Sequence, residues 1–188
     1  GVPACRDAVP AACLPRGAVV SAVRSARTPE EERVWKILES VLDPEIPVLS
    51  IVDLGIVRQV TVGAGGVEVG LTSTYSGCPA TDVIRRLVNE ALATHRVQAS
   101  VRMILNPAWT TEWISAEGRR KLGEYGIAPP RVLAGTHLDA TSANEQAVDC
   151  PRCGAAHTER LSEFGSTPCK SLYRCKEWRE PFERFKCL

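Results

Sequence analysis

The sequence predicts an α+β protein in which a small two-layer α/β domain precedes a small cysteine-rich domain. Between residues 28 and 108 the apolar residues recur first with a helical period, then as two strands, then as a second helix and a third strand. Beyond residue 130 this periodicity stops. Most of the 8 cysteines lie after residue 149, where the chain has too little apolar sequence to fold without a metal or disulfides.

Composition narrows the class of protein. The chain has 188 residues, 44% of them hydrophobic and only 5% aromatic, so a largely aliphatic core is expected. A net charge of +1 predicts no surface for nucleic acid, and no apolar run reaches the roughly 18–20 residues that a membrane helix needs. Prolines interrupt the apolar stretch at the start of the chain, so an export signal is not expected there. Reduced thiols in the cytoplasm are expected rather than the disulfides of a secreted protein.

Residues 1–27 are predicted to be a disordered leader, in which Cys5 and Cys13 have no assigned function. Order is expected to begin at Thr28, which starts a capping box with a proline at the first helical position. The apolar face of the helix that follows consists of Val34, Ile37, Leu38 and Val41. Pro44 is expected to end this helix, because the residue before a proline is pushed out of the helical region.

A β-hairpin, a second helix and a third strand follow. The segments 56–62 and 67–71 flank a glycine-rich loop that suits a hairpin. A helix is expected from about Pro79 to Thr94, and a strand over residues 97–105. The predicted buried face of that strand consists of Val97, Ala99, Val101, Met103 and Leu105. Together these elements predict a domain over residues 28–108 with its helices packed on one sheet.

The rest of the chain is predicted to hold a connection and a second domain. Residues 109–148 are expected to form a short helix, at about 115–125, and a linker. Residues 149–188 are expected to form a separate zinc-ribbon-like domain. Cys150 and Cys153 stand two residues apart before a glycine, a spacing that presents both thiolates to one cation.

The second half of this expected tetrahedral site is incomplete. Cys175 follows at a suitable distance, but Trp178 stands where the other cysteine of its pair is expected. The leading interpretation is structural zinc, and its predicted ligands are Cys150, Cys153, Cys175 and either Cys169 or Cys187. His157 as the fourth ligand, disulfides, a weak or transient iron–sulfur site, and a three-ligand or metal-free site are the alternatives.

Cys78 is the cysteine of the first domain. If Pro79 begins the second helix, Cys78 is its N-cap, where free N–H groups and the helix dipole lower the pKa of a thiol and favour a reactive thiolate. Thr74 would place a hydroxyl nearby. Asp43 and Glu45 would meet the thiol if their loop lies at the same edge of the sheet. A buried cysteine that only caps the helix is the alternative.

Two segments resemble the family of iron–sulfur assembly domains that includes SufT, namely residues 43–57 and 74–80. Further segments resemble the PaaD family, whose members are accessory proteins of the bacterial phenylacetyl-CoA epoxidase system. These segments are 109–114, 125–130, 164–167 and 180–187, together with the Cys-Pro-Arg-Cys motif at 150–153. The resemblance covers roughly residues 28–188 and therefore both predicted domains.

This resemblance implies a role in aerobic phenylacetate catabolism. The epoxidase that it implies as a partner combines a diiron oxygenase with an iron–sulfur flavoprotein reductase, and the iron–sulfur assembly machinery is a further implied partner. It also implies that Cys78 handles a metal or cluster, with Asp43 and Glu45 as companions. The chain departs from the family pattern at Ser73, where proline is common, and at Trp178, where cysteine is expected.

The expected function is a non-catalytic accessory factor that helps to assemble iron–sulfur or diiron centres of the epoxidase. Direct oxygenase chemistry is not expected, because the sequence lacks the paired Glu-x-x-His motif of a diiron bundle. Similar numbers of basic and acidic residues after residue 148 argue against a nucleic-acid-binding ribbon. The alternative is a stoichiometric structural subunit of the oxygenase complex, in which Cys78 is only structural.

Overall fold

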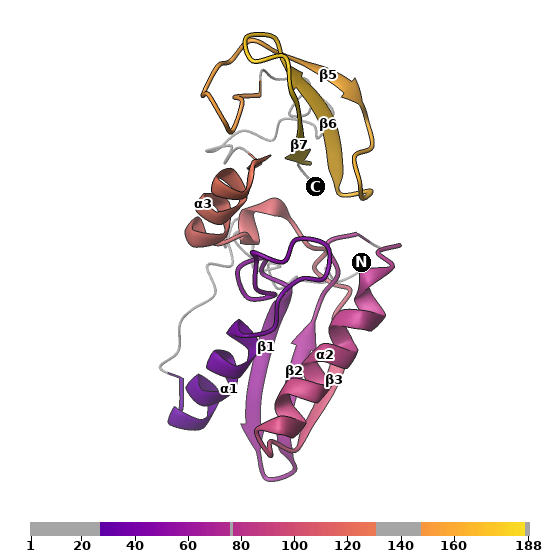
Figure 1. Ribbon diagram of the computed structural model, residues 1–188. Coiled ribbons are helices and arrows are strands. Elements are labelled where there is room, and N and C mark those ends of the chain that lie inside the picture. Colours follow the sequence, from indigo (N-terminus) through magenta and orange to yellow (C-terminus); the bar gives the residue numbers. More distant parts are fainter. Residues whose placement is uncertain (1–26, 76, 131–147, 187–188) are drawn as a thin grey trace, which may run out of the picture.

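The computed structural model describes residues 27–75, 77–130 and 148–186. One end of the molecule consists of a three-stranded sheet with two helices, and the other end contains a four-stranded sheet (Figure 1). This arrangement confirms the predicted α+β class. Within the described part of the chain, no helix is both long enough and apolar enough to cross a bilayer.

Helix α1 (Pro29–Glu39) begins where the sequence predicts. The N–H of Glu31 donates to the Thr28 hydroxyl at 3.2 Å, and the N–H of Thr28 donates to the Glu31 carboxylate at 2.8 Å, so the capping box is complete. The buried residues of the helix are Val34, Ile37 and Leu38. The helix ends before the predicted stop at Pro44, and Val41 reaches the core from the following loop.

The first sheet has the order β1-β2-β3. Strands β1 (Val57–Gly63) and β2 (Gly66–Leu71) form the predicted antiparallel hairpin. Strand β3 (Ala99–Met103) pairs in parallel with β2, so helix α2 (Ala80–Thr94) is the crossover between them. The prediction that Leu105 belongs to the buried face is wrong, because the strand ends before it and its side chain is 77% exposed.

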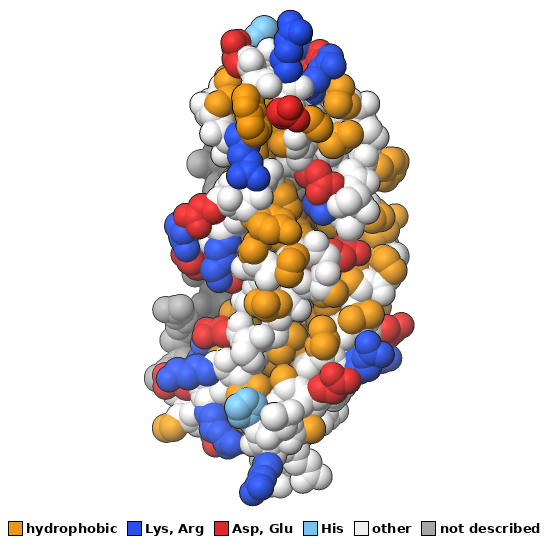
Figure 2. Space-filling model, in the orientation of Figure 1, with side chains coloured by type: hydrophobic (Ala, Val, Ile, Leu, Met, Phe, Trp, Pro, Cys, Tyr) orange, Lys and Arg blue, Asp and Glu red, His pale blue; other side chains and the backbone are white. Residues whose placement is uncertain are grey.

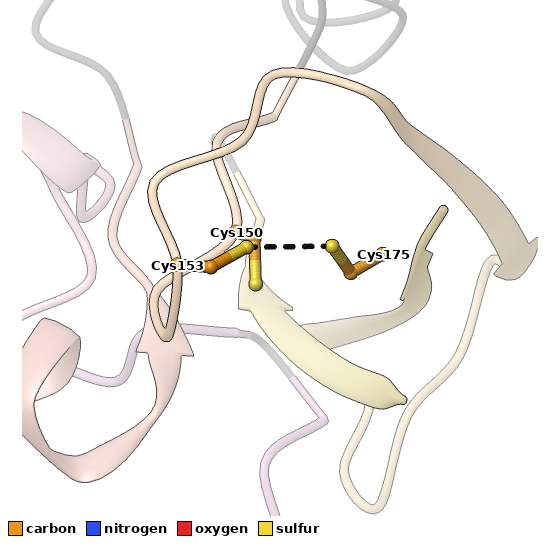
Figure 3. Close-up of side chains that lie close together, drawn as sticks. All are labelled: Cys150, Cys153 and Cys175. Carbon is orange, nitrogen blue, oxygen red and sulfur yellow. Dashed lines mark hydrogen bonds between the residues drawn. The ribbon is translucent and has the colours of Figure 1, made fainter. Parts of the chain in front are cut away.

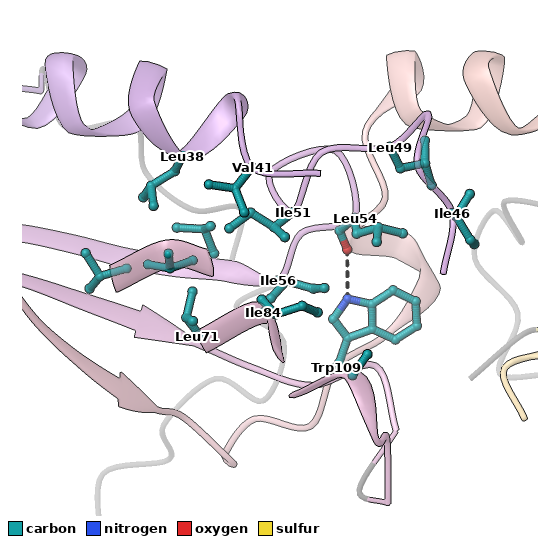
Figure 4. Close-up of a cluster of buried hydrophobic side chains, with 14 of the residues drawn as sticks. Leu38, Val41, Ile46, Leu49, Ile51, Leu54, Ile56, Leu71, Ile84 and Trp109 are labelled. Carbon is teal, nitrogen blue, oxygen red and sulfur yellow. Dashed lines mark hydrogen bonds between the residues drawn. The ribbon is translucent and has the colours of Figure 1, made fainter. Parts of the chain in front are cut away.

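The main core lies between this sheet and the two helices. It is largely aliphatic, as the composition predicts, and its side chains come from α1, α2, the sheet and the loop after α1 (Figure 4). Trp109 joins this core from the segment after β3. Its indole N–H donates to the carbonyl oxygen of Leu54 at 2.9 Å, which satisfies the buried polar end of the ring (Figure 4).

The segment after Trp109 is fastened to the first domain by Asp53. It forms the short helix η1 (Thr111–Trp113) and helix α3 (Ala116–Tyr125), which a glycine with a φ of 98° ends as predicted. The buried Asp53 carboxylate accepts hydrogen bonds from the Ser115 hydroxyl at 3.0 Å and from the Lys121 ammonium at 2.7 Å. One aspartate therefore holds both the start and the middle of α3.

The second sheet has the order β4-β7-β6-β5. Strands β5 (Thr158–Ser162), β6 (Lys170–Cys175) and β7 (Pro181–Phe185) pair antiparallel and come from the predicted ribbon. Strand β4 (Ile127–Ala128) pairs in parallel with β7. The segment predicted to be a connection thus adds a strand to the ribbon sheet. The predicted linker falls mostly on residues 131–147, outside the described residues.

The ribbon packs against the first domain rather than standing apart from it. Cys169 and Phe185 belong to the main core, and the Phe185 ring lies 6.0 Å from the Trp109 ring between centroids. A smaller core fills the ribbon itself, and its buried members are Ala128, Val148, Cys150, Tyr173, Cys175 and Phe182. In the space-filling view, hydrophobic side chains continue from one domain to the other across the junction (Figure 2).

Candidate metal and thiol sites

Three cysteines converge in the ribbon (Figure 3). The Sγ atoms of Cys150, Cys153 and Cys175 all lie within 4.8 Å of one another, and those of Cys153 and Cys175 are 3.6 Å apart. Cys150 and Cys175 are buried, while Cys153 is exposed. Thiolates gathered in this way are the donor set that zinc and similar thiophilic cations prefer. The structure therefore brings together three of the predicted ligands.

Two turns of the same form carry these thiols. In the first turn, the N–H of Gly154 donates to the carbonyl oxygen of Cys150 at 2.8 Å, and the N–H of Cys150 donates to the carbonyl oxygen of Ala155 at 2.9 Å. In the second turn, the N–H of Arg179 donates to the carbonyl oxygen of Cys175 at 2.8 Å, and the N–H of Cys175 donates to the carbonyl oxygen of Glu180 at 3.1 Å. Gly154 and Arg179 both have a positive φ, of 74° and 62°. The two turns are thus equivalent in backbone form.

Trp178 occupies in the second turn the position that Cys153 occupies in the first. Its backbone N–H donates to the Cys175 sulfur at 3.3 Å, and this hydrogen bond holds the pKa of Cys175 below its usual value. The indole is 50% exposed and offers no ligand atom for a metal. The residues that the structure describes therefore fit a thiophilic cation with three thiolates and supply no fourth protein ligand.

The other predicted ligands do not complete this site. Cys169 lies just before β6 and Cys175 at its far end, so a strand of about 17–20 Å separates them and Cys169 cannot act as predicted. His157 is outside the group of converging donors, and its Nδ1 lies 3.3 Å from a glutamate carboxylate. Cys187 lies outside the described residues, so its assignment stays a prediction.

A second set of candidate residues lines a pocket at the junction of the two domains. The part of its lining that comes from the first domain includes all four predicted site residues, namely Asp43, Glu45, Thr74 and Cys78. The ribbon contributes Cys169 and Phe185. Much of the remaining lining is apolar, from the core side chains of the first domain. The structure thus gathers the four residues predicted to handle a metal or cluster, while that role itself stays a prediction.

The two carboxylates of the pocket are partly withdrawn from solvent. The Asp43 carboxylate accepts hydrogen bonds from the N–H groups of Glu45 at 2.9 Å and Ile46 at 2.8 Å. Burial nevertheless raises the pKa of Asp43, although those two hydrogen bonds and the positive charge of Lys170 act to lower it. Burial and the charge of Asp43 together raise the pKa of Glu45. A cation that enters the pocket would therefore relieve an unfavourable accumulation of negative charge.

The thiol of Cys78 does not have the predicted character. Helix α2 begins one residue later than expected, so Pro79 is the N-cap and Cys78 precedes it. Burial raises the pKa of the thiol, and the pocket carboxylates raise it further, while hydrogen bonds from the N–H of Ala80 and the Thr81 side chain oppose this only in part. The prediction of a lowered pKa and a reactive thiolate is therefore wrong.

Comparisons with known proteins match both domains. The model of the PaaD zinc beta ribbon domain matches residues 134–186, and that of the iron–sulfur cluster assembly protein family matches residues 31–102. A protein of Escherichia coli (strain K12) that is named as a subunit of 1,2-phenylacetyl-CoA epoxidase is 48% identical over 161 residues. The aligned part covers 85% of this chain and 94% of that protein. The chain belongs to the PaaD family.

Shorter relatives match half of this PaaD-family chain. A protein of Porphyromonas gingivalis named as an Fe-S protein maturation auxiliary factor is 38% identical over 96 residues, which are 50% of this chain and 90% of that protein. The crystal structure of a domain of unknown function, DUF59, from Bacillus anthracis is 33% identical and covers 50% of this chain and 91% of its own, with a TM-score of 0.47.

Two residues of this PaaD-family chain have roles that the sequence analysis did not predict. Asp53 clamps α3, and a lone aspartate within an apolar run is the signal that points to buried hydrogen-bond donors. Cys169 shares a pocket with Cys78, although its position in the sequence suggests a ribbon ligand. No local signal places it there, because the contact depends on the packing of Phe185 into the main core.

Proposed function

We propose that this chain is a non-catalytic accessory factor, acting in the cytoplasm, that helps to assemble the iron–sulfur or diiron centres of phenylacetyl-CoA epoxidase. The E. coli relative is named as a subunit of this epoxidase, and the P. gingivalis relative is named as an Fe-S protein maturation factor. The match of residues 31–102 to the iron–sulfur cluster assembly family supports the same role.

The observation that carries the proposal is the pocket at the domain junction. It places the Cys78 thiol beside two carboxylates, Asp43 and Glu45, in surroundings that are otherwise largely apolar. Carboxylate and thiolate are both ligands of iron, which is here the cargo rather than a resident cofactor. Burial raises the pKa of the thiol, so a cation that binds the sulfur would displace its proton to solvent, and loss of the cation would let the sulfur take a proton from solvent again.

The ribbon supports this role in a different way. Its three thiolates would hold a structural cation, zinc being the metal that suits such a donor set, and so stabilise a domain with a small core. In the proposal this domain docks onto a subunit of the epoxidase or onto a carrier of the iron–sulfur assembly machinery. The pocket beside it is then held close to the client.

A stoichiometric structural subunit is the second candidate, and it is favoured by the name of the E. coli relative, which describes that protein as a subunit of the epoxidase. In that case the chain would co-purify with the oxygenase at a fixed ratio. The ratio and the metal content of the oxygenase would both be unaffected by Cys78→Ser.

The test uses a strain that carries only Cys78→Ser in place of the native chain. We expect the purified epoxidase to contain less iron and sulfide than the enzyme from the wild-type strain, because its cargo thiol is lost. Cys13→Ser is the matched control, since it removes a thiol to which no function is assigned. Epoxidase with full metal content and activity from the Cys78→Ser strain would refute the proposal.

A further inference from the structure

We propose that the pocket between the two domains is a two-thiolate cation site, in which Cys169 of the ribbon and Cys78 of the first domain bind one thiophilic divalent cation. Fe(II), Co(II) and Zn(II) are the cations of this class. The inference rests on the proposed function, because it names the ligands that would hold the cargo. It adds to that function a ligand from the second domain.

The position of Cys169 carries the inference. It lies just before β6, yet it is buried in the main core and lines the same pocket as Cys78. Its carbonyl oxygen accepts the N–H of Lys186 at 2.9 Å, which ties it to the chain just after β7. Phe185 packs on Trp109 and so fixes this part of the ribbon against the first domain. The two thiols therefore face one pocket from different domains.

The lining of the pocket brings two acidic side chains together with the two thiols. The Thr167 hydroxyl lies 3.1 Å from the Cys169 sulfur and is a polar partner from its own domain. Two thiols and two carboxylates, those of Asp43 and Glu45, thus border one space.

This donor set suits a transition metal better than a hard cation. Thiolates select soft or borderline cations, and the carboxylates would balance the remaining charge. Lys170 lies beside the pocket, but its ammonium is paired with the Glu183 carboxylate at 2.8 Å. The charge of Lys170 still opposes the rise in the pKa of Asp43 and of Glu45 but does not overcome it, so both carboxylates would gain from a cation in the pocket.

The pocket differs from the ribbon site in how far it is assembled. Among the described residues, only the ribbon cysteines form a group of three or more donors within 4.8 Å of one another. The donors of the pocket must therefore move together to hold a cation. Glu45 is only partly buried, so its side chain is less constrained by packing than that of the buried Asp43. A site that is completed by the cation binds it less tightly than a preformed one, which suits a cargo that must be released.

The test is an anaerobic titration of the full chain with Co(II), whose thiolate charge-transfer absorption reports on bound sulfur. The wild-type chain is expected to bind one cation in the ribbon and a second, weaker one in the pocket. Cys169→Ser and Cys78→Ser should each abolish the second and keep the first. Cys153→Ser is the control, since it should weaken the first and keep the second. A second cation that binds to Cys169→Ser as it binds to wild type would overturn the inference.

A second measurement needs no variant and so does not depend on folding of Cys169→Ser. Alkylation of individual thiols is followed by mass spectrometry while Zn(II) is added to the wild-type chain. Cys78 and Cys169 should become protected over the same range of zinc concentration, after the ribbon thiols. Protection of Cys78 without Cys169 would overturn the inference but leave the proposed function intact. Protection of both Cys78 and Cys169, combined with a normal epoxidase from the Cys78→Ser strain, would support the two-thiolate site and refute the proposed function.

Discussion

Replacing Trp178 by cysteine should convert the ribbon from a three-thiolate to a four-thiolate site. The backbone around Trp178 already matches that around Cys153, including the positive φ of the following residue and its hydrogen bond. A cysteine at this position would point its sulfur as Cys153 does. No backbone movement is needed, so the gain in metal affinity should be close to that of an added ligand.

The size of this gain follows from the energetics of zinc sites. Structural zinc bound by four ligands contributes about 10–16 kcal/mol in zinc-finger peptides, or roughly 2.5–4 kcal/mol for each ligand. The fourth thiolate should therefore lower the Kd about 10²–10³-fold, since about 1.4 kcal/mol corresponds to a factor of ten. Loss of the indole opposes this only weakly, because half of the side chain is exposed. The N–H that donates to Cys175 belongs to the backbone and is retained.

The assay is competition for Zn(II) between the protein and a chromophoric chelator, with elemental analysis of the purified chains. Trp178→Ser is the matched control, because it removes the indole and adds no thiol. An equal rise in affinity for Trp178→Ser would show that the indole obstructs the site. An unchanged affinity for Trp178→Cys would refute the three-thiolate assignment and indicate that another ligand, such as Cys187, already completes the site.

Two further predictions concern the contacts that position the sites. The hydrogen bonds to Asp53 from Lys121, Ser50 and Ser115 outweigh its burial and lower its pKa, so the stability that they give is present above the ordinary pKa near 3.9 and is lost as the pH falls through the folded-state value. Asp53→Asn should lower the free energy of unfolding by about 1–2 kcal/mol at pH 7 and remove this part of its dependence on pH, as measured by urea unfolding from pH 7 to pH 3. An unchanged pH dependence would contradict this prediction. Phe185→Ala should lower the free energy of unfolding by about 3–5 kcal/mol, because the ring is 1% exposed and packs on Trp109. Phe164→Ala, at a phenylalanine that is 63% exposed, is the control and should cost less than about 1 kcal/mol; equal losses would contradict the packing argument.

The sequence predicted the local elements well because their signals are local. The capping box at Thr28, the apolar stripe of α2 and the glycine after α3 each depend on residues within a few positions of one another. Leu105 shows where such signals fail. Its alternation with Met103 continues the strand pattern, but the ladder to β2 ends at Met103 and the next residues leave the sheet.

The candidate sites were predictable only in part. The Cys-x-x-Cys spacing identifies Cys150 and Cys153 because a tight turn brings them together. The pKa of Cys78 was predicted in the wrong direction, since a one-residue error in the helix start was combined with burial that the sequence does not show. The place of Cys169 could not be predicted, because it follows from contacts between segments far apart in the chain.

The junction between the domains explains how one chain can hold two thiol sites with different properties. The ribbon thiols lie on two turns whose backbones are fixed by their own hydrogen bonds, so their separation does not depend on the first domain. The pocket thiols lie on different domains, and their separation depends on the packing of Phe185 and Trp109. If a client docks on the ribbon and a cation occupies each site, as proposed, a shift of the ribbon would leave its own cation in place while pulling Cys169 away from Cys78. Such a shift would release a cation from the pocket at the point where the client is bound.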